Sequence, residues 1–194
     1  MEQKRIILAY SGGIRSTVAM YHYINRGYIV TVVAFLEDGT FESNDVSTID
    51  DASLLLSEGI AVDVASSDKF IQKITDSFVF DLIELSEEMD VLEVAICGFT
   101  DTGMLQKVKK LVNSGRIVGW QPFFYFIYDS IDKSMVLREG LKFNVPLHLT
   151  RSCEKTTKHH CGICDKCVAR KNSFMDAGIP DVTVYCDNNG GGVC

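Results

Sequence analysis

Four cysteines near the C-terminus have the spacing of a metal site. They are separated by seven, two and two residues, and the short gaps suit the tight turns that bring thiolates onto one metal ion. Zinc prefers four tetrahedral sulfur or nitrogen ligands, and a site closed by four cysteines is structural rather than catalytic. The spacing therefore predicts a structural zinc site with the ligands Cys153, Cys161, Cys164 and Cys167.

The surroundings of these cysteines leave two other ligand schemes open. The last three cysteines also begin a ferredoxin-type run for an iron–sulfur cluster, but that run requires a further cysteine where Lys171 stands. His159 and His160 are adjacent, and zinc accepts an imidazole in place of a thiolate. With four thiols at hand, we expect both histidines beside the site or on the surface. Zinc is the metal that the ligand spacing favours.

A second group of small and polar residues lies near the N-terminus. An apolar strand is expected over residues 5–10 and a helix over 16–26, with a glycine-containing turn between them. Glycine lets the backbone approach an anion closely, and the free amides at a helix N-terminus point at it. An ordinary strand-to-helix turn can have the same letters. As a phosphate site, this loop would bind ATP through Tyr10, Ser11, Gly12, Gly13, Ile14, Arg15, Ser16 and Thr17.

Strand and helix patterns alternate along most of the chain. Short apolar runs predict strands, and longer stretches with apolar residues on one face predict helices. This alternation predicts the α/β class, with a Rossmann-like, doubly wound parallel sheet. An aromatic-rich stretch at 120–128 interrupts it before the last helix and the cysteines. The expected strands are 5–10, 29–36, 60–65 and 91–97, and the expected helices are 16–26, 45–58, 70–89, 102–113 and 130–143.

The composition is that of an ordinary globular chain. Hydrophobic residues make up 46% of it, charged residues 23%, and the net charge is −7. A protein that grips a phosphate backbone usually has a basic face, so we expect no direct binding to nucleic acid. No apolar run approaches the ~20 residues that span a bilayer, and no secretion signal opens the chain. These features predict a cytoplasmic protein without a membrane contact.

The N-terminal loop and the cysteines together resemble one family. Residues 11–17 (SGGIRST) are similar to the SGGxDS signature of the PP-loop ATP pyrophosphatases, with Arg15 in place of the aspartate. Residues 129–153, 160–170 and 174–185 are similar to the lysine-containing helix, the CGxCxxCxxR motif and the F-x-x-x-G-x-x-D-x-x-x-Y ending of the 7-cyano-7-deazaguanine synthase family of queuosine biosynthesis. The chain looks like a divergent member, because the Pro-Gly-Arg-Asn segment of that family has no counterpart here.

The resemblance implies a division of the chain and a reaction. Residues 1–150 would form a PP-loop nucleotide-binding domain and 151–186 a zinc-binding segment, while the composition of 187–194 predicts a flexible tail. An enzyme of this family uses ATP and Mg²⁺ to adenylate 7-carboxy-7-deazaguanine, and ammonia then displaces AMP to give the amide. A second activation and dehydration give the nitrile. The family also implies a homodimer.

The resemblance assigns catalytic and substrate-binding residues as well. Ser11 and Ser16 would hold the β- and γ-phosphates, and Lys133 would stabilise charge on the leaving phosphates. Gly98 and Asp101 would line the crevice at the strand ends, with Asp101 pairing with the guanine-like edge of the base. Simpler explanations exist for two of them. Asp101 is also a good cap for the helix that follows it, and Lys133 can be a solvated helix residue.

Three other functions are compatible with the sequence. A PP-loop sulfurtransferase acting on tRNA needs a reactive thiol near the adenylate, and Cys97 lies at the end of an expected strand in that region. Free cysteine is more often a small buried hydrophobe. A relative that conjugates the activated base to a protein amine would share the first step. A catalytically degenerate nucleotide-binding protein is the third alternative, because Arg15 replaces the aspartate of the motif.

Overall fold

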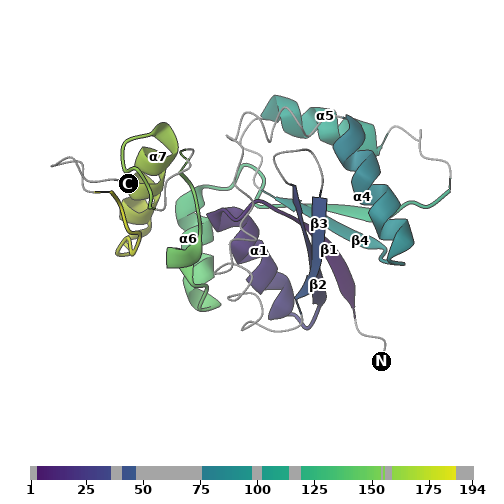
Figure 1. Cartoon of the computed structure of the whole chain (residues 1–194), viewed down its shortest axis with the longest axis horizontal. Coiled ribbons are helices and arrows are strands. Elements are labelled where there is room, and N and C mark those ends of the chain that lie inside the picture. Colours follow the sequence, from purple (N-terminus) through teal and green to yellow (C-terminus); the bar gives the residue numbers. More distant parts are fainter. Residues whose placement is uncertain are drawn as a thin grey trace.

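The computed structural model describes residues 4–35, 41–46, 76–97, 102–113, 119–153, 155 and 159–186. A five-stranded sheet with the strand order β3-β2-β1-β4-β5 forms its centre (Figure 1). Four strands run parallel, with β2 and β4 on opposite sides of β1, so the chain winds in both directions from the first strand. The predicted α/β class with a doubly wound sheet is confirmed. The parallel strands are β1 (Arg5–Tyr10), β2 (Ile29–Phe35), β4 (Glu93–Cys97) and β5 (Phe123–Ile127).

Helices cover both faces of this sheet. Alternate residues of β1 face opposite layers, as the pleat of a strand requires. Ile6 and Leu8 pack in the core formed with α1 and α6, whereas Ile7 and Ala9 pack in the core formed with α4 and α5. Figure 1 shows these two pairs of helices on opposite sides of the sheet. The bounds are α1 (Ile14–Ile24), α4 (Asp76–Glu88), α5 (Thr102–Val112) and α6 (Lys133–Lys142).

The edge strand β3 (Phe41–Val46) corrects one prediction. The sequence predicts a helix over 45–58, but Asp45 and Val46 belong to a strand that runs antiparallel to β2. Backbone pairing extends from Phe41 opposite Phe35 to Val46 opposite Val30. This ladder along the free edge of β2 outweighs the local helix-start signal, as tertiary context often does. The remainder of that predicted helix and the predicted strand 60–65 lie outside the described residues.

The other elements lie near their predicted positions and differ mainly at their ends. Helix α1 begins earlier than predicted, at Ile14, and α6 begins later, at Lys133. The aromatic-rich stretch, for which no strand was expected, contains β5. Within the described part of the chain, none of the helices has the length and hydropathy that a bilayer-spanning segment requires. The predicted tail, 187–194, lies outside that part.

A last helix, α7 (Asp165–Ala177), packs on α6 and was not predicted. Phe174 and Ala177 of α7 join the core cluster that contains α1 and α6. Arg138 of α6 donates hydrogen bonds to the carbonyls of Asp176 at 2.8 Å and Ala177 at 3.2 Å, at the end of α7. In Figure 1 the helices α1, α6 and α7 follow one another outward from the sheet. The cysteine segment is thereby attached to the layer that also carries the N-terminal loop.

Candidate functional site

The four predicted zinc ligands lie together. All four sulfurs are within 4.8 Å of one another, with 3.9 Å between Cys161 and Cys167 and 4.0 Å between Cys153 and Cys164. Four thiolates around zinc, with Zn–S bonds of about 2.3 Å, place their sulfurs about 3.8 Å apart in a tetrahedron. Three of the cysteines are buried and Cys164 is half-buried. The cluster is therefore compatible with a metal such as zinc, enclosed by four thiolates.

Backbone amides surround these sulfurs. The amides of Lys155 and Cys161 donate to the sulfur of Cys153 at 3.4 and 3.3 Å, and the amide of Cys164 donates to the sulfur of Cys161 at 3.4 Å. Such hydrogen bonds favour the thiolate, which is the form that binds a metal. Gly162 has a φ of 75°, a left-handed backbone angle that residues with a side chain rarely adopt. It lets the chain turn between Cys161 and Cys164.

His160 precedes Cys161 and forms its contacts with other residues. Its Nε2 accepts a hydrogen bond from the backbone amide of Ser152 at 3.0 Å. The backbone of His160 forms an isolated parallel bridge with Tyr185, and the two rings meet edge to face at 5.9 Å. The group of possible metal ligands found among the described residues contains no histidine. His160 thus supports the metal segment, as expected of a residue beside the site.

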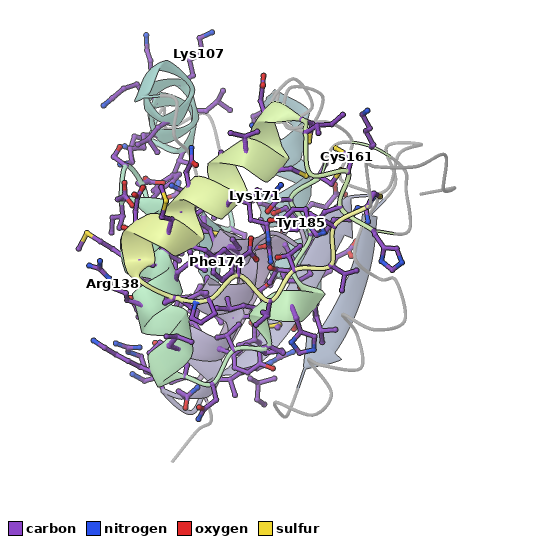
Figure 2. The ribbon with its side chains drawn as sticks, turned by 90° about the vertical axis from the view of Figure 1, so that its left-hand side faces the viewer. Lys107, Arg138, Cys161, Lys171, Phe174 and Tyr185 are labelled. Atoms are coloured by element: carbon purple, nitrogen blue, oxygen red, sulfur yellow. The ribbon has the colours of Figure 1, made fainter. Side chains whose placement is uncertain are left out.

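Arg170, the most buried charged side chain among the described residues, ties the cysteine segment together. Its side chain is 0% exposed. Its guanidinium donates to the hydroxyls of Thr183 (2.6 Å), Thr150 (2.9 Å) and Ser152 (3.2 Å) and to the carbonyl of Leu147 (2.8 Å). One arginine therefore joins the stretch before the first cysteine to the stretch after α7. Figure 2 shows this arrangement from outside, with Cys161 beyond one end of α7, Phe174 near the other, and Tyr185 on the segment that runs back along the helix.

Residues of the family-like ending complete this network. Asp181 accepts hydrogen bonds from the backbone amide of Thr183 at 3.0 Å and from the hydroxyl of Tyr185 at 2.5 Å, and lies 4.0 Å from Nε of Arg170. Gly178 ends α7 with a φ of 69°, the left-handed geometry that favours glycine at a helix end. The residues of the F-x-x-x-G-x-x-D-x-x-x-Y ending thus belong to one connected structural unit.

A direct contact joins the cysteine segment to the N-terminal loop. The backbone amide of Arg151 donates a hydrogen bond to the carbonyl of Gly12 at 2.9 Å. A Cβ atom added at Gly13 would lie 3.7 Å from the carbonyl oxygen of Arg151. The sequence offered no signal for this contact, because its partners lie far apart along the chain. The two predicted sites are therefore neighbours.

The loop after β1 has the backbone of a phosphate site. Gly12 has a φ of 69°, and Gly13 is the N-cap of α1 without any side-chain cap. The first turn of α1 contains no acidic residue. Amides at the start of a helix have no partner inside it, and together with the helix dipole they attract anions. Ile14 is 2% exposed and belongs to the core, so its contribution is limited to its backbone.

The hydroxyls of the loop mostly form hydrogen bonds within the loop. Ser16 and Thr17 are 1% and 0% exposed. Ser16 donates to the carbonyl of Gly13 at 3.1 Å and accepts from the amide of Ser11 at 3.3 Å. Thr17 donates to the same carbonyl at 2.9 Å and contacts the phenol of Tyr10 at 3.2 Å. The half-buried hydroxyl of Ser11 lies 3.2 Å from that of Ser16. Direct phosphate contacts by these side chains stay predictions.

Two cations from distant parts of the chain meet beside the loop. Arg15 donates from Nη2 to the carbonyl of Ile131 at 2.9 Å, which places it next to the start of α6. Lys133, the first residue of α6, is half-buried, and its pKa is lowered to about 8, first by burial and then by the charge of Arg15. A bound anion relieves the repulsion between two neighbouring cations. The pair therefore suits phosphate, and the burial of Lys133 argues against a merely solvated residue.

The third region of interest is the end of β4. Burial raises the pKa of the Cys97 thiol to about 12. A thiol with this pKa is protonated at neutral pH and is a poor nucleophile, which disfavours a sulfurtransferase. Gly98 and Asp101 lie outside the described residues, so their roles stay predictions.

Comparison with known proteins gives a consistent result. The family model described as "Queuosine biosynthesis protein QueC" matches residues 103–178, which contain Lys133 and the four cysteines. A 7-cyano-7-deazaguanine synthase of Nautilia profundicola is 26% identical over 94% of this chain and 98% of its own. A 7-cyano-7-deazaguanine synthase 1 of Sulfurisphaera tokodaii is 25% identical over 93% of this chain and 98% of its own. One from Aliarcobacter butzleri is 36% identical over 42% of this chain and 36% of its own. The chain is therefore similar to the family of the queuosine biosynthesis protein QueC over residues 103–178, and to 7-cyano-7-deazaguanine synthases over most of its length.

Proposed function

We propose that the chain is an ATP-dependent 7-cyano-7-deazaguanine synthase. It adenylates 7-carboxy-7-deazaguanine, ammonia converts the adenylate to the amide, and a second activation with loss of water gives the nitrile. The observation that carries this proposal is the similarity to the synthases of Nautilia profundicola and Sulfurisphaera tokodaii over 98% of the length of each. The glycine loop beside two cations supplies a matching place for ATP.

In this proposal the loop after β1 holds the phosphates of ATP. The amides of the first turn of α1 and the hydroxyl of Ser11 bind phosphate oxygens, and Arg15 and Lys133 balance their charge. Mg²⁺ prefers oxygen ligands and is commonly carried by substrate phosphates. It fits here as an ion carried by ATP, because position 15 offers a guanidinium and no carboxylate ligand. It would add charge neutralisation at the phosphates.

The division of labour follows the two sites. Residues 1–150 would bind ATP and the base, and residues 151–186 would hold zinc. Cys153, Cys161, Cys164 and Cys167 would hold the metal, and four thiolate ligands would leave it no open coordination position for chemistry, so it would serve stability. Through the hydrogen bond between Arg151 and Gly12 the metal segment also supports the phosphate loop. We also propose a homodimer, on the resemblance alone, which sedimentation equilibrium would test.

Ammonia as the nucleophile fits the chemistry of Cys97 better than thiolation does. The raised pKa of this thiol keeps it protonated at neutral pH. A Cys97→Ser variant should therefore retain nitrile synthesis with unchanged kcat. A loss of activity in a folded Cys97→Ser protein would instead support a role for the sulfur.

The test is a reaction with ATP, Mg²⁺, 7-carboxy-7-deazaguanine and ammonium, in which AMP and the nitrile are measured together. The proposal expects AMP and nitrile to accumulate together, with one AMP for each of the two activations. Leaving out ammonium should stop the nitrile, and leaving out the base should stop AMP. AMP with a different adduct would point to another nucleophile. Nucleotide binding without any AMP would support the degenerate alternative that Arg15 raises.

A further inference from the structure

One buried acid near the loop has no role in the function described so far. Asp129 follows the last residue of β5, Ile127, at the edge of the sheet where the carboxyl ends of the parallel strands lie. Its two neighbours, Tyr128 and Ser130, have φ angles of 61° and 54°. Residues other than glycine rarely adopt this left-handed conformation, and those that do are concentrated at functional sites. The backbone thus holds Asp129 in place at a conformational cost.

The carboxylate of Asp129 is short of hydrogen-bond donors. Its side chain is 11% exposed, and both oxygens are buried without a hydrogen bond from any described residue. Lys109 forms a long ion pair with it, at 3.5 Å. Burial raises the pKa of Asp129, while the charges of Lys109 and Arg15 lower it. A buried carboxylate with one distant cation and no hydrogen bond from the described residues is costly, so its presence in a folded protein calls for an explanation.

The neighbours of Asp129 place it on the substrate side of the phosphate loop. Arg15 and Cys97 both interact electrostatically with it. Cys97 ends β4, which lies between β1 and β5, and Arg15 is in the first turn of α1 after the loop. Ligands of such sheets bind outside the carboxyl ends of the strands, where the winding changes direction, here between β1 and β4. Asp129 therefore borders the same crevice as the loop, on the side of β4 and β5.

The local charges decide which ligand suits this carboxylate. A divalent cation is disfavoured, because the positive charges of Arg15 and Lys109 already face Asp129 and would repel it. An uncharged ligand edge with two adjacent N–H groups is not repelled and supplies hydrogen-bond donors. A carboxylate accepts two parallel N–H bonds, as it does from a guanidinium. The guanine-like ring of the proposed substrate has such an edge, formed by its ring N–H and its 2-amino group.

We propose that Asp129 binds the N–H and 2-amino edge of 7-carboxy-7-deazaguanine and so selects the base. The inference rests on the proposed function and deepens it. It moves to Asp129 the recognition that the sequence assigned to Asp101. Arg15, on the loop side of Asp129, lies between this base edge and the phosphates.

Equilibrium binding to the whole zinc-loaded protein tests this. The probes are 7-carboxy-7-deazaguanine and the analogue without the 2-amino group, with Asp129→Asn as the variant and the exposed carboxylate Asp176→Asn as the matched control. Wild type and Asp176→Asn should prefer the natural base by about tenfold to a hundredfold, the size expected for lost hydrogen bonds to a charged group. In Asp129→Asn this preference should vanish, while the Kd for ATP stays unchanged.

Three results would overturn the inference. The first is a preference that survives in Asp129→Asn, and the second is one that disappears in Asp101→Asn instead. The third is equal binding of the two probes to the wild type, which decides the matter even if Asp129→Asn does not fold. A wild type that forms the nitrile but ignores the 2-amino group refutes the role of Asp129 alone. A wild type that binds ATP but neither base refutes the proposed function as well.

Discussion

Replacing Arg170 with methionine removes the charge that holds the metal segment together. The side chain is 0% exposed and donates four hydrogen bonds, to three hydroxyls and one carbonyl. Methionine replaces the aliphatic stem of arginine but not its guanidinium and has no donor, so these acceptors lose their partner inside the protein. The change tests whether the network around Arg170 stabilises the segment or only accompanies it.

The size of the effect follows from the partners that remain. Breaking a buried charged pair typically costs about 3–5 kcal/mol. Asp181 lies 4.0 Å from Arg170 and keeps its bonds from Thr183 and Tyr185, so its carboxylate is not left without donors. The loss should therefore be near the lower end, about 3 kcal/mol. This is a large fraction of the 5–15 kcal/mol that a folded domain typically has.

Urea unfolding at a fixed excess of zinc measures this difference. Arg138→Met is the matched control, because Arg138 is exposed and donates to only two carbonyls, at the end of α7. The control should lose about 1 kcal/mol. If Arg170→Met costs no more than Arg138→Met, the network does not contribute the stability assigned to it here.

Three further predictions concern the loop, the metal and the core. Because the pKa of Lys133 is about 8, its charge is present below pH 8 and lost above it, so ATP affinity should fall between pH 7 and 9. The charged groups that act on this pKa are Arg15, Lys166, Arg170 and Asp132. Calorimetry should show that ATP affinity depends less on pH in Lys133→Met than in the wild type. An identical pH profile would contradict the role of Lys133 in ATP binding. Removing the metal with a chelator should weaken ATP binding, because the amide of Arg151, close to the cysteines, bonds to the carbonyl of Gly12. Unchanged ATP affinity in folded, zinc-free protein would show that the Arg151–Gly12 hydrogen bond is not needed for ATP binding. In Gly140→Ala the new Cβ would lie 2.9 Å from Cγ2 of Val18, which should cost about 1–3 kcal/mol in thermal unfolding. Adding Val18→Ala should cost less than the sum of the two single changes, and strict additivity would rule out the clash.

The fold could be predicted where the pattern is local. β1 and β4 are buried on both faces of the sheet, so their apolar runs are almost uninterrupted and predict strands. β5 lies at the edge of the sheet, and its residues Phe123 and Tyr125 are 66% and 43% exposed. Because aromatic residues occur on both faces of this strand, the sequence pattern did not show which face is buried. Strand β3 depends on pairing with β2, and this long-range interaction overrode a local helix signal.

The same distinction holds for the site. The cluster of four cysteines follows from short spacings, because turns between cysteines two residues apart are local structures. The glycine loop was predictable for the same reason. Arg15 beside Lys133, and Arg151 beside Gly12, are contacts across the whole chain, which one sequence does not reveal. Asp129 was missed because its lack of donors is visible only once its neighbours are placed.

The hydrogen bond between Arg151 and Gly12 also sets an order for making the protein. Gly12 precedes Arg151 along the chain and is therefore synthesised well before it. Proteins generally begin to fold from the N-terminus during synthesis. The loop must therefore wait, unsupported, until residue 151 and the cysteines after it have been made. The cysteines and the peptide that completes the loop are made at the same stage of translation. A chain that stops before residue 151 therefore contains the glycines of the loop but lacks the amide that bonds to Gly12.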